Sequence, residues 1–234
     1  LKNGRFLRDR MMDEDGRLWR IYKDDKRSIN GFLDDYALTI QAFIALYEAT
    51  FDETWLQSAR QLTDYAHTHF FDERSGLYFF TSDLDPPLVT RKMEIMDDVI
   101  PASNSVMAHN LFELGHFFYE EAYLQRARHM MTGIYETLQE VEQPHYYSNW
   151  SRLYLRYLQP AWEVAIVGPR TEALRQEMQR HFIPNALLLG GEEEGSLELL
   201  QGKLQEGETY IYVCQNKICR LPVQQVEEAL AQMQ

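Results

Sequence analysis

The chain has 234 residues, which is enough for one large domain or two small ones. Hydrophobic residues make up 45% of it and charged residues 25%, a composition typical of soluble globular proteins. The net charge of −13 argues against general binding to nucleic acids or to an anionic membrane surface, because both require a basic face. No apolar run reaches the roughly 18 residues of a membrane-spanning helix, and no signal peptide is visible.

The first 30 residues resemble the end of a helical unit followed by a turn. Asp13, Asp15 and Gly16 form a turn signal, the segment RLWRIY alternates like a short strand, and residues 23–30 read as a polar loop. The chain begins with Leu1 rather than with methionine. We therefore expect it to be a piece of a longer protein.

Helical periodicity dominates the chain as far as residue 158. Apolar stripes predict helices over residues 32–49, 54–70, 103–119, 121–140 and 145–158. The second and fourth of these share a pattern, since WLQSAR from Trp55 resembles YLQRAR from Tyr123. A repeated helical hairpin predicts stacked αα units.

The pattern changes at Pro160. Short apolar strands are expected at WEVAIVG, NALLLG and TYIYVC, with a helix over residues 171–181 after the first strand and a final helix opening at Pro222. The acidic interval 190–207 reads as an exposed excursion. The sequence thus predicts a mainly α protein, in which an incomplete α/α toroid (1–159) precedes a small α/β domain (160–234). Because such a toroid exposes apolar faces, we also expect the fragment to self-associate.

Two cysteines, Cys214 and Cys219, are too few for a disulfide scaffold, and their spacing is not that of the redox motif C-x-x-C. With no export signal, we expect two reduced thiols on or near a strand and a cytoplasmic location. No cofactor or metal is indicated, since the chain has no G-x-G-x-x-G, no Walker loop, no H-E-x-x-H and no Cys/His cluster.

Four motifs, in their order and spacing, resemble one protein family: LDDYA (33–37), DDVIPASNS (97–105), VAIVG (164–168) and YVC-x4-C-x2-P (212–222). They are similar to the C-terminal third of proteins that join a thioredoxin-like domain to a six-hairpin (α/α) barrel, whose animal members are called spermatogenesis-associated thioredoxin-like proteins. The resemblance implies a barrel similar to that of N-acylglucosamine 2-epimerases and a thioredoxin-like domain elsewhere in the complete protein. Where the family usually reads D-G-A-x-P-S-G-N-S, Asp98 and Ala102-Ser103 replace its glycines, which weakens the case for ligand contacts through those glycines.

The repeat gives a reason to group the polar residues at two helix starts. If both hairpins are units of one toroid, their first helices line its interior and begin at the same rim, where N–H groups and helix dipoles also point. The residues at this rim are Asp34, Asp35, Tyr36, Asp97, Asp98, Ser103 and Asn104. Such a rim can bind sugar hydroxyls, with Asp35 and Asp97 as a catalytic acid–base pair. Alternatively, these residues are ordinary helix caps and a solvated turn.

Two further residues are candidates for the same site. Arg91 could bind an anionic group of a substrate, or it is a surface charge after a Pro-Pro loop. His109, within two turns of the helix start, could transfer a proton during epimerisation, or it is a hydrogen-bonded structural histidine.

Three function classes follow from this site and the resemblance. The first is a sugar epimerase or isomerase, and the second is a non-catalytic ligand-binding or scaffolding module of a thioredoxin-domain protein. The third is a glycoside hydrolase, which needs two carboxylates facing each other at roughly 5–10 Å. The expected partner is a sugar-like small molecule, together with the thioredoxin-like domain that this chain lacks.

Overall fold

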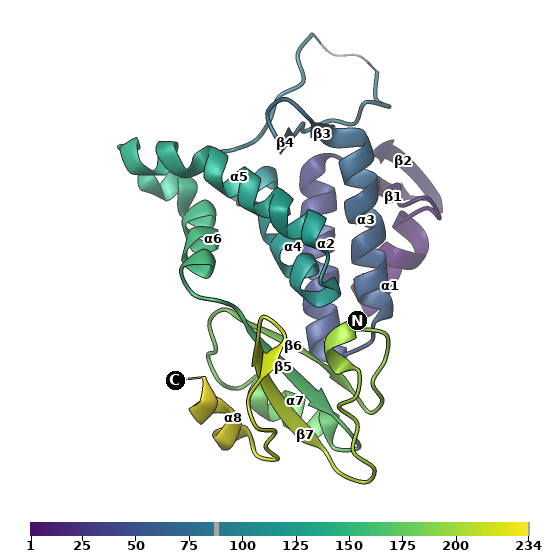
Figure 1. The fold of residues 1–234 in the computed structure, drawn as a ribbon. Helices are drawn as coiled ribbons and strands as arrows, with labels where there is room; N and C mark the ends of the chain where they lie inside the picture. The colour runs from purple at the N-terminus through teal and green to yellow at the C-terminus, as the bar shows by residue number, and fades with distance from the viewer. Residues whose placement is uncertain (87–88, 234) are drawn as a thin grey trace. The chain divides into compact units, whose positions relative to one another are not determined.

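The structure is a computed structural model that describes residues 1–86 and 89–233. The chain forms two compact units. The first, called the helical unit below, contains Leu1–Ala45, Thr54–His116 and Glu120–Tyr154, and the second, the α/β unit, contains Leu46–Glu53, Phe117–Tyr119 and Leu155–Gln234. About half of the described residues are helical, so the protein is mainly α with a small α/β part (Figure 1).

The helical unit begins with a short helix, a π-helical turn and a β-hairpin: α1 (Lys2–Phe6), η1 (Leu7–Met11), β1 (Trp19–Lys23) and β2 (Lys26–Asn30). The prediction of a polar loop over residues 23–30 is therefore wrong, because most of this segment is strand β2. Asp24 and Asp25 both have positive φ angles, 51° and 55°, as a two-residue hairpin turn requires. Strand β2 is mostly exposed and is held by antiparallel pairing with β1, so its side chains give no apolar pattern.

Four long helices follow, at the positions that the periodicity predicts: α2 (Leu33–Thr50), α3 (Thr54–Phe70), α4 (Ser103–Phe118) and α5 (Glu121–Glu140). Helix α4 is buried on nearly every side, whereas α3 and α5 each bury one face. The Asn110 side chain of α4 donates to the Ala37 carbonyl of α2 at 2.8 Å. A Cβ atom at Gly115 would lie 2.6 Å from Leu124 Cδ2, so α4 and α5 pack closely there.

Short elements connect and close the helical unit: β3 (Phe71–Asp72), β4 (Leu77–Tyr78), η2 (Pro144–Tyr147) and α6 (Ser148–Leu158). The helix predicted over residues 145–158 thus begins as a 3-10 turn. Strands β3 and β4 form a two-residue antiparallel pair. The chain from β4 to α4 has no regular structure among its described residues. It contains residues 94–98 (EIMDD), which are called the acidic segment below.

The α/β unit contains a four-stranded sheet in the order β6-β5-β7-β8, in which β5 and β6 are parallel and the other pairs antiparallel. Its elements are β5 (Trp162–Val167), α7 (Thr171–Met178), β6 (Ala186–Gly191), η3 (Glu198–Leu200), β7 (Tyr210–Gln215), β8 (Ile218–Cys219) and α8 (Val226–Gln232). Both helices share one apolar core with the sheet, formed by Val164, Ile166, Leu174, Met178, Leu188, Ile211, Val213, Val226 and Ala229. The strand–helix–strand unit predicted from residue 160 onward is confirmed in this coarse form.

Two details of this unit differ from the prediction. The last helix begins at Val226 rather than at Pro222, because Val223 forms a β-bridge with Ile211 and so keeps the chain extended. The interval 190–207 is not simply an exposed excursion, because Leu197, Leu199 and Leu200 are buried around the 3-10 turn η3.

The prediction of two free thiols is also wrong, because Cys214 and Cys219 form a disulfide. The two residues are direct partners across the β7–β8 hairpin, with Cα atoms 3.9 Å apart. Asn216 and Lys217 have positive φ angles, 50° and 67°, and form the two-residue turn between the strands. The turn sets the register that brings the two sulfur atoms together, and spacing along the sequence does not reveal that register.

Candidate functional site

Asp97 is the buried aspartate of the acidic segment, and it accepts four hydrogen bonds. One carboxylate oxygen accepts the Ala102 N–H at 2.9 Å and the Ser105 hydroxyl at 3.2 Å. The other accepts the Asn149 N–H at 2.9 Å and the Ser148 hydroxyl at 3.4 Å. Asp97 is only 6% exposed. Its carboxylate therefore ties the segment to the start of α6, and its lone pairs are directed at the protein itself.

Asn104 fastens the same segment to strand β4. Its side-chain Nδ2 donates to the carbonyls of Tyr78 at 2.8 Å and Glu94 at 3.0 Å, and its Oδ1 accepts the Tyr78 N–H at 2.8 Å. The residue is fully buried in the first turn of α4. The amide thus makes a bidentate latch with the backbone, which leaves it poorly placed to contact a substrate.

His109 and Ser103, also on α4, are buried as well, with 1% exposure each. The His109 Nε2 lies 2.9 Å from the Asn149 carbonyl. Because a carbonyl only accepts, this nitrogen must carry a proton and donate it. The Ser103 hydroxyl has no hydrogen-bond partner within the described residues, so the alternative in which it caps α4 is wrong.

The carboxylates at the start of α2 cap that helix and pair with Arg20. Asp35 accepts the Phe32 N–H at 2.9 Å, which is the backward bond of a capping box, and the Arg20 guanidinium at 2.6 Å. Arg20 also reaches Asp34 at 3.3 Å. Burial raises the pKa of Asp35, while the Phe32 N–H and Arg20 act in the opposite direction.

Tyr36 and Arg91 also have internal partners. The Tyr36 hydroxyl accepts the Leu18 N–H at 2.7 Å, its ring stacks on Tyr65, and burial raises its pKa. The Arg91 guanidinium donates to the carbonyls of Thr81 and His69 and lies over the Phe79 ring at 4.2 Å. Both side chains therefore hold loops against the helices.

The predicted rim residues thus fall into separate hydrogen-bonded groups. Asp34 and Asp35 share Arg20, whereas Asp97 and Asn104 bind the backbone around β4, α4 and α6. Within residues 1–86 and 89–233, no hydrogen bond or ion pair joins Asp35 to Asp97. The same ranges contain no group of three His, Cys, Asp or Glu side chains suited to a metal.

An open groove of about 640 Å³ lies beside the acidic segment, and only Asp98 of the predicted site residues lines it. The groove is mainly apolar, with polar groups from the 92–98 segment and from α5. It is lined by Leu77, Lys92, Met93, Glu94, Ile95, Met96, Asp98, Gly133, Ile134, Thr137 and Tyr147. Lys92 and Glu94 form an ion pair at 2.9 Å. The Asp98 side chain is exposed and makes no hydrogen bond within the described part of the chain.

Gly133 opens the groove from the side of α5. A Cβ atom at this position would have no neighbour within 4 Å, so there is space above the helix. Glu94, Gly133 and Thr137 line the groove although we did not predict them from the sequence. Gly133 was the one local indication of the groove in the sequence. A glycine inside a helix lowers the helix propensity, so it usually has a packing or functional role.

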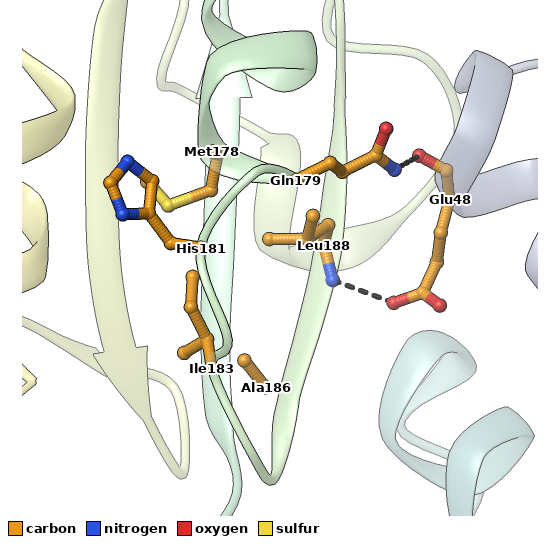
Figure 2. A pocket seen from close by; sticks show the side chains of 7 residues that line it. All are labelled: Glu48, Met178, Gln179, His181, Ile183, Ala186 and Leu188. Carbon is orange, nitrogen blue, oxygen red and sulfur yellow. Dashed lines mark hydrogen bonds between the residues drawn. The ribbon is translucent and has the colours of Figure 1, made fainter.

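A smaller hollow of about 220 Å³ lies in the α/β unit, between α7, β6 and residue 48 (Figure 2). The Leu188 N–H donates to the Glu48 carboxylate at 2.9 Å, and the Gln179 side chain donates to the Glu48 carbonyl at 2.8 Å. Figure 2 marks both hydrogen bonds with dashed lines. Glu48 therefore satisfies the Leu188 N–H, a backbone donor on the unpaired edge of β6. This contact protects the edge strand from pairing with another chain, which explains the polar contacts beside the hollow without a ligand.

The fold is that of a mainly α protein with a small α/β part. No family model matches the chain. The chain is 29% identical to spermatogenesis-associated protein 20 of Homo sapiens, over 82% of this chain and 26% of that protein. The Mus musculus protein of the same name matches with the same identity and coverage. An uncharacterized protein of Caenorhabditis elegans is 25% identical over 94% of this chain and 32% of its own length.

These matches support a relationship to spermatogenesis-associated protein 20. The chain spans about a quarter of the length of the mammalian relatives. No helix within the described ranges could cross a membrane, since each is too short or too polar.

Proposed function

We propose that the helical unit is a non-catalytic ligand-binding module of a protein related to spermatogenesis-associated protein 20. The observation that supports this best is the contrast between the groove and the residues around it. The groove is open and has an available carboxylate on Asp98, whereas Asp97, Asn104 and His109 bind other parts of the protein. A module that holds its acidic segment rigid beside an open groove is built for binding rather than for proton transfer.

The ligand class follows from the lining. Leu77, Ile134 and the methionines offer an apolar surface, while Asp98, Thr137 and the Lys92–Glu94 pair offer acceptors and donors at the border. A compact ligand with one apolar face and several hydroxyls fits such a surface, and a sugar ring has both. The sugar-like partner therefore remains part of the proposal.

The catalytic alternatives remain predictions. A sugar epimerase or isomerase would need His109 to reach a substrate, and a glycoside hydrolase would need a second carboxylate opposite Asp98. The incomplete α/α toroid over residues 1–159, the thioredoxin-like domain in the complete protein and the cytoplasmic location rest on the resemblance and on the sequence. Self-association also remains a prediction; Met96, Val99 and Ile100 are exposed apolar residues that could take part in it.

A thermal-shift screen of mono- and disaccharides with matched variants tests the proposal. Gly133→Phe should fill the groove without disturbing the fold, because its Cβ enters open space, and Gly133→Ala is the control that leaves the groove open. A binding sugar at about 100 times its Kd should raise the Tm of the parent and of Gly133→Ala by about 5 °C. Gly133→Phe should lose this shift, and Asp98→Asn should weaken binding roughly tenfold.

Two results would contradict the proposal. A sugar that stabilises Gly133→Phe as much as the parent binds elsewhere. If no sugar stabilises the parent, the ligand class is wrong.

A further inference from the structure

The disulfide between Cys214 and Cys219 links two strands that the backbone already joins. The cysteines lie five positions apart, on either side of a two-residue turn, and are paired in the β7–β8 ladder. A disulfide stabilises a fold mainly by restricting the unfolded chain, and this effect is smallest for short loops. Strand β7 is also paired with β5 over five residue pairs. The sheet therefore does not depend on this disulfide.

The two cysteine residues differ in exposure. Cys214 is fully buried in the sheet, whereas Cys219 lies partly exposed on the two-residue edge strand β8, next to Ile218, which is 78% exposed. A thiolate from solvent should therefore reach Cys219 more readily than the buried Cys214. Access of this kind, together with thiolate character, determines which disulfides undergo exchange.

The hairpin turn contacts polar groups that lie outside the hairpin. The Lys217 N–H donates to the Glu163 carboxylate at 3.2 Å, and its ammonium group lies 2.7 Å from Glu198 and 4.0 Å from the centre of the Tyr119 ring. Glu163 is only 2% exposed, so the turn supplies a donor to a buried carboxylate. A change in the order of the turn would alter the surroundings of that carboxylate.

We propose that the Cys214–Cys219 disulfide is a redox-sensitive clasp, which a dithiol opens to release the β7–β8 turn while the rest of the sheet stays folded. A thiolate of the dithiol attacks the Cys219 sulfur, the S–S bond breaks, and Cys214 leaves with the electron pair and takes up a proton. The second thiol of the dithiol then attacks the reagent's own sulfur in the mixed disulfide, and Cys219 leaves as a thiolate that takes up a proton. The dithiol is oxidised to a cyclic disulfide by two electrons, and the protein gains two thiols.

Hydrogen exchange of the full chain, with and without dithiothreitol, tests this clasp. Reduction should accelerate exchange of the Ile218 and Arg220 amides at least tenfold, while the amides of β5 keep their protection. Alkylation during reduction should label Cys219 at least tenfold faster than Cys214, and re-oxidation should restore the slow exchange. Cys219→Ser should exchange like the reduced protein and should not respond to dithiothreitol.

Three outcomes would overturn the clasp. In the first, reduction unfolds the β5 amides together with the turn, so the disulfide is simply structural. In the second, the Ile218 and Arg220 amides exchange at the same rate in both states. In the third, mass spectrometry finds two free thiols even after treatment with an oxidant.

Discussion

Asp97 and Asp98 are neighbours with the same side chain and very different surroundings. Asp97 is buried and accepts hydrogen bonds from two backbone N–H groups and two hydroxyls. Asp98 is exposed at the border of the groove. The sequence placed both carboxylates in one candidate site, but their roles differ. Asp97 stabilises the acidic segment, whereas the Asp98 carboxylate is available to a ligand.

Asparagine substitutions at both positions should separate these roles. Asp97→Asn replaces one charged acceptor oxygen by an N–H2 group that faces existing donors, so we expect a loss of about 2 kcal/mol in the free energy of unfolding. Asp98→Asn is the matched control and should change it by less than about 0.5 kcal/mol. Urea denaturation followed by tryptophan fluorescence measures both, and equal effects would contradict this assignment.

At the scale of elements, α3 and α5 face each other through a row of polar pairs. Arg60, Asp64 and His67 lie on one face of α3, since they are spaced by four and three residues. Arg60 reaches Glu120 at 3.5 Å, Asp64 accepts the Tyr123 hydroxyl, and His67 Nε2 lies 3.0 Å from the Arg126 guanidinium. Arginine only donates, so His67 Nε2 must be the acceptor and the ring is neutral.

From this arrangement we expect the packing of α3 and α5 to depend on pH. Burial lowers the pKa of His67 and the positive charge of Arg126 lowers it further, whereas Glu73 and Asp64 oppose the shift. Below a pH of about 6.5 the unfolded chain binds this proton before the folded protein does, so stability should fall as the pH drops through that range.

Unfolding experiments at pH 7.5 and 5.5 test the effect. His67→Gln can still accept the Arg126 hydrogen bond but does not titrate, so its stability should fall less than that of the parent between these two values. The same substitution at the exposed His145 is the control and should keep the pH dependence of the parent. An unchanged dependence in His67→Gln would show that protonation of His67 does not affect folding.

At the scale of the molecule, the α/β unit takes part of its structure from an earlier stretch of the chain. Glu48 accepts the Leu188 N–H, Glu53 accepts the Ser196 N–H at 2.9 Å, and Phe51 packs on the core of this unit. These three residues come from the end of α2 and the turn that follows. A boundary at residue 160 therefore separates the unit from some of its own contacts.

A fragment of residues 160–234 should show this dependence. Without Glu48, the amide of Leu188 on the edge strand β6 loses its acceptor and should exchange at least tenfold faster than in the full chain. The amides of Ile166 and Val213, in central strands, serve as internal controls. Equal protection of Leu188 in the fragment and in the full chain would mean that residues 46–53 contribute little.

The sequence by itself determined the elements whose signal is local. Helices α3 and α5 begin and end where their apolar stripes predict, because each needs only one face to be apolar. Strands β5 and β6 were predicted for a different reason, because each is a short, mainly apolar run that is buried on both faces of the sheet. Strand β2 was missed because its exposed side chains carry no pattern and pairing with β1 holds it in place.

Only the tertiary structure decided which polar residues are available for chemistry. Asp97 is buried whereas Asp98 is exposed, and the Asn104 side chain of α4 donates to the backbone of β4. The register of β7 and β8 pairs Cys214 with Cys219. The groove itself is built from residues 77, 92–96, 98, 133, 134, 137 and 147, which come from four separate stretches of the sequence. Burial, register and cavities depend on contacts between distant segments, and no local pattern of residues encodes those contacts.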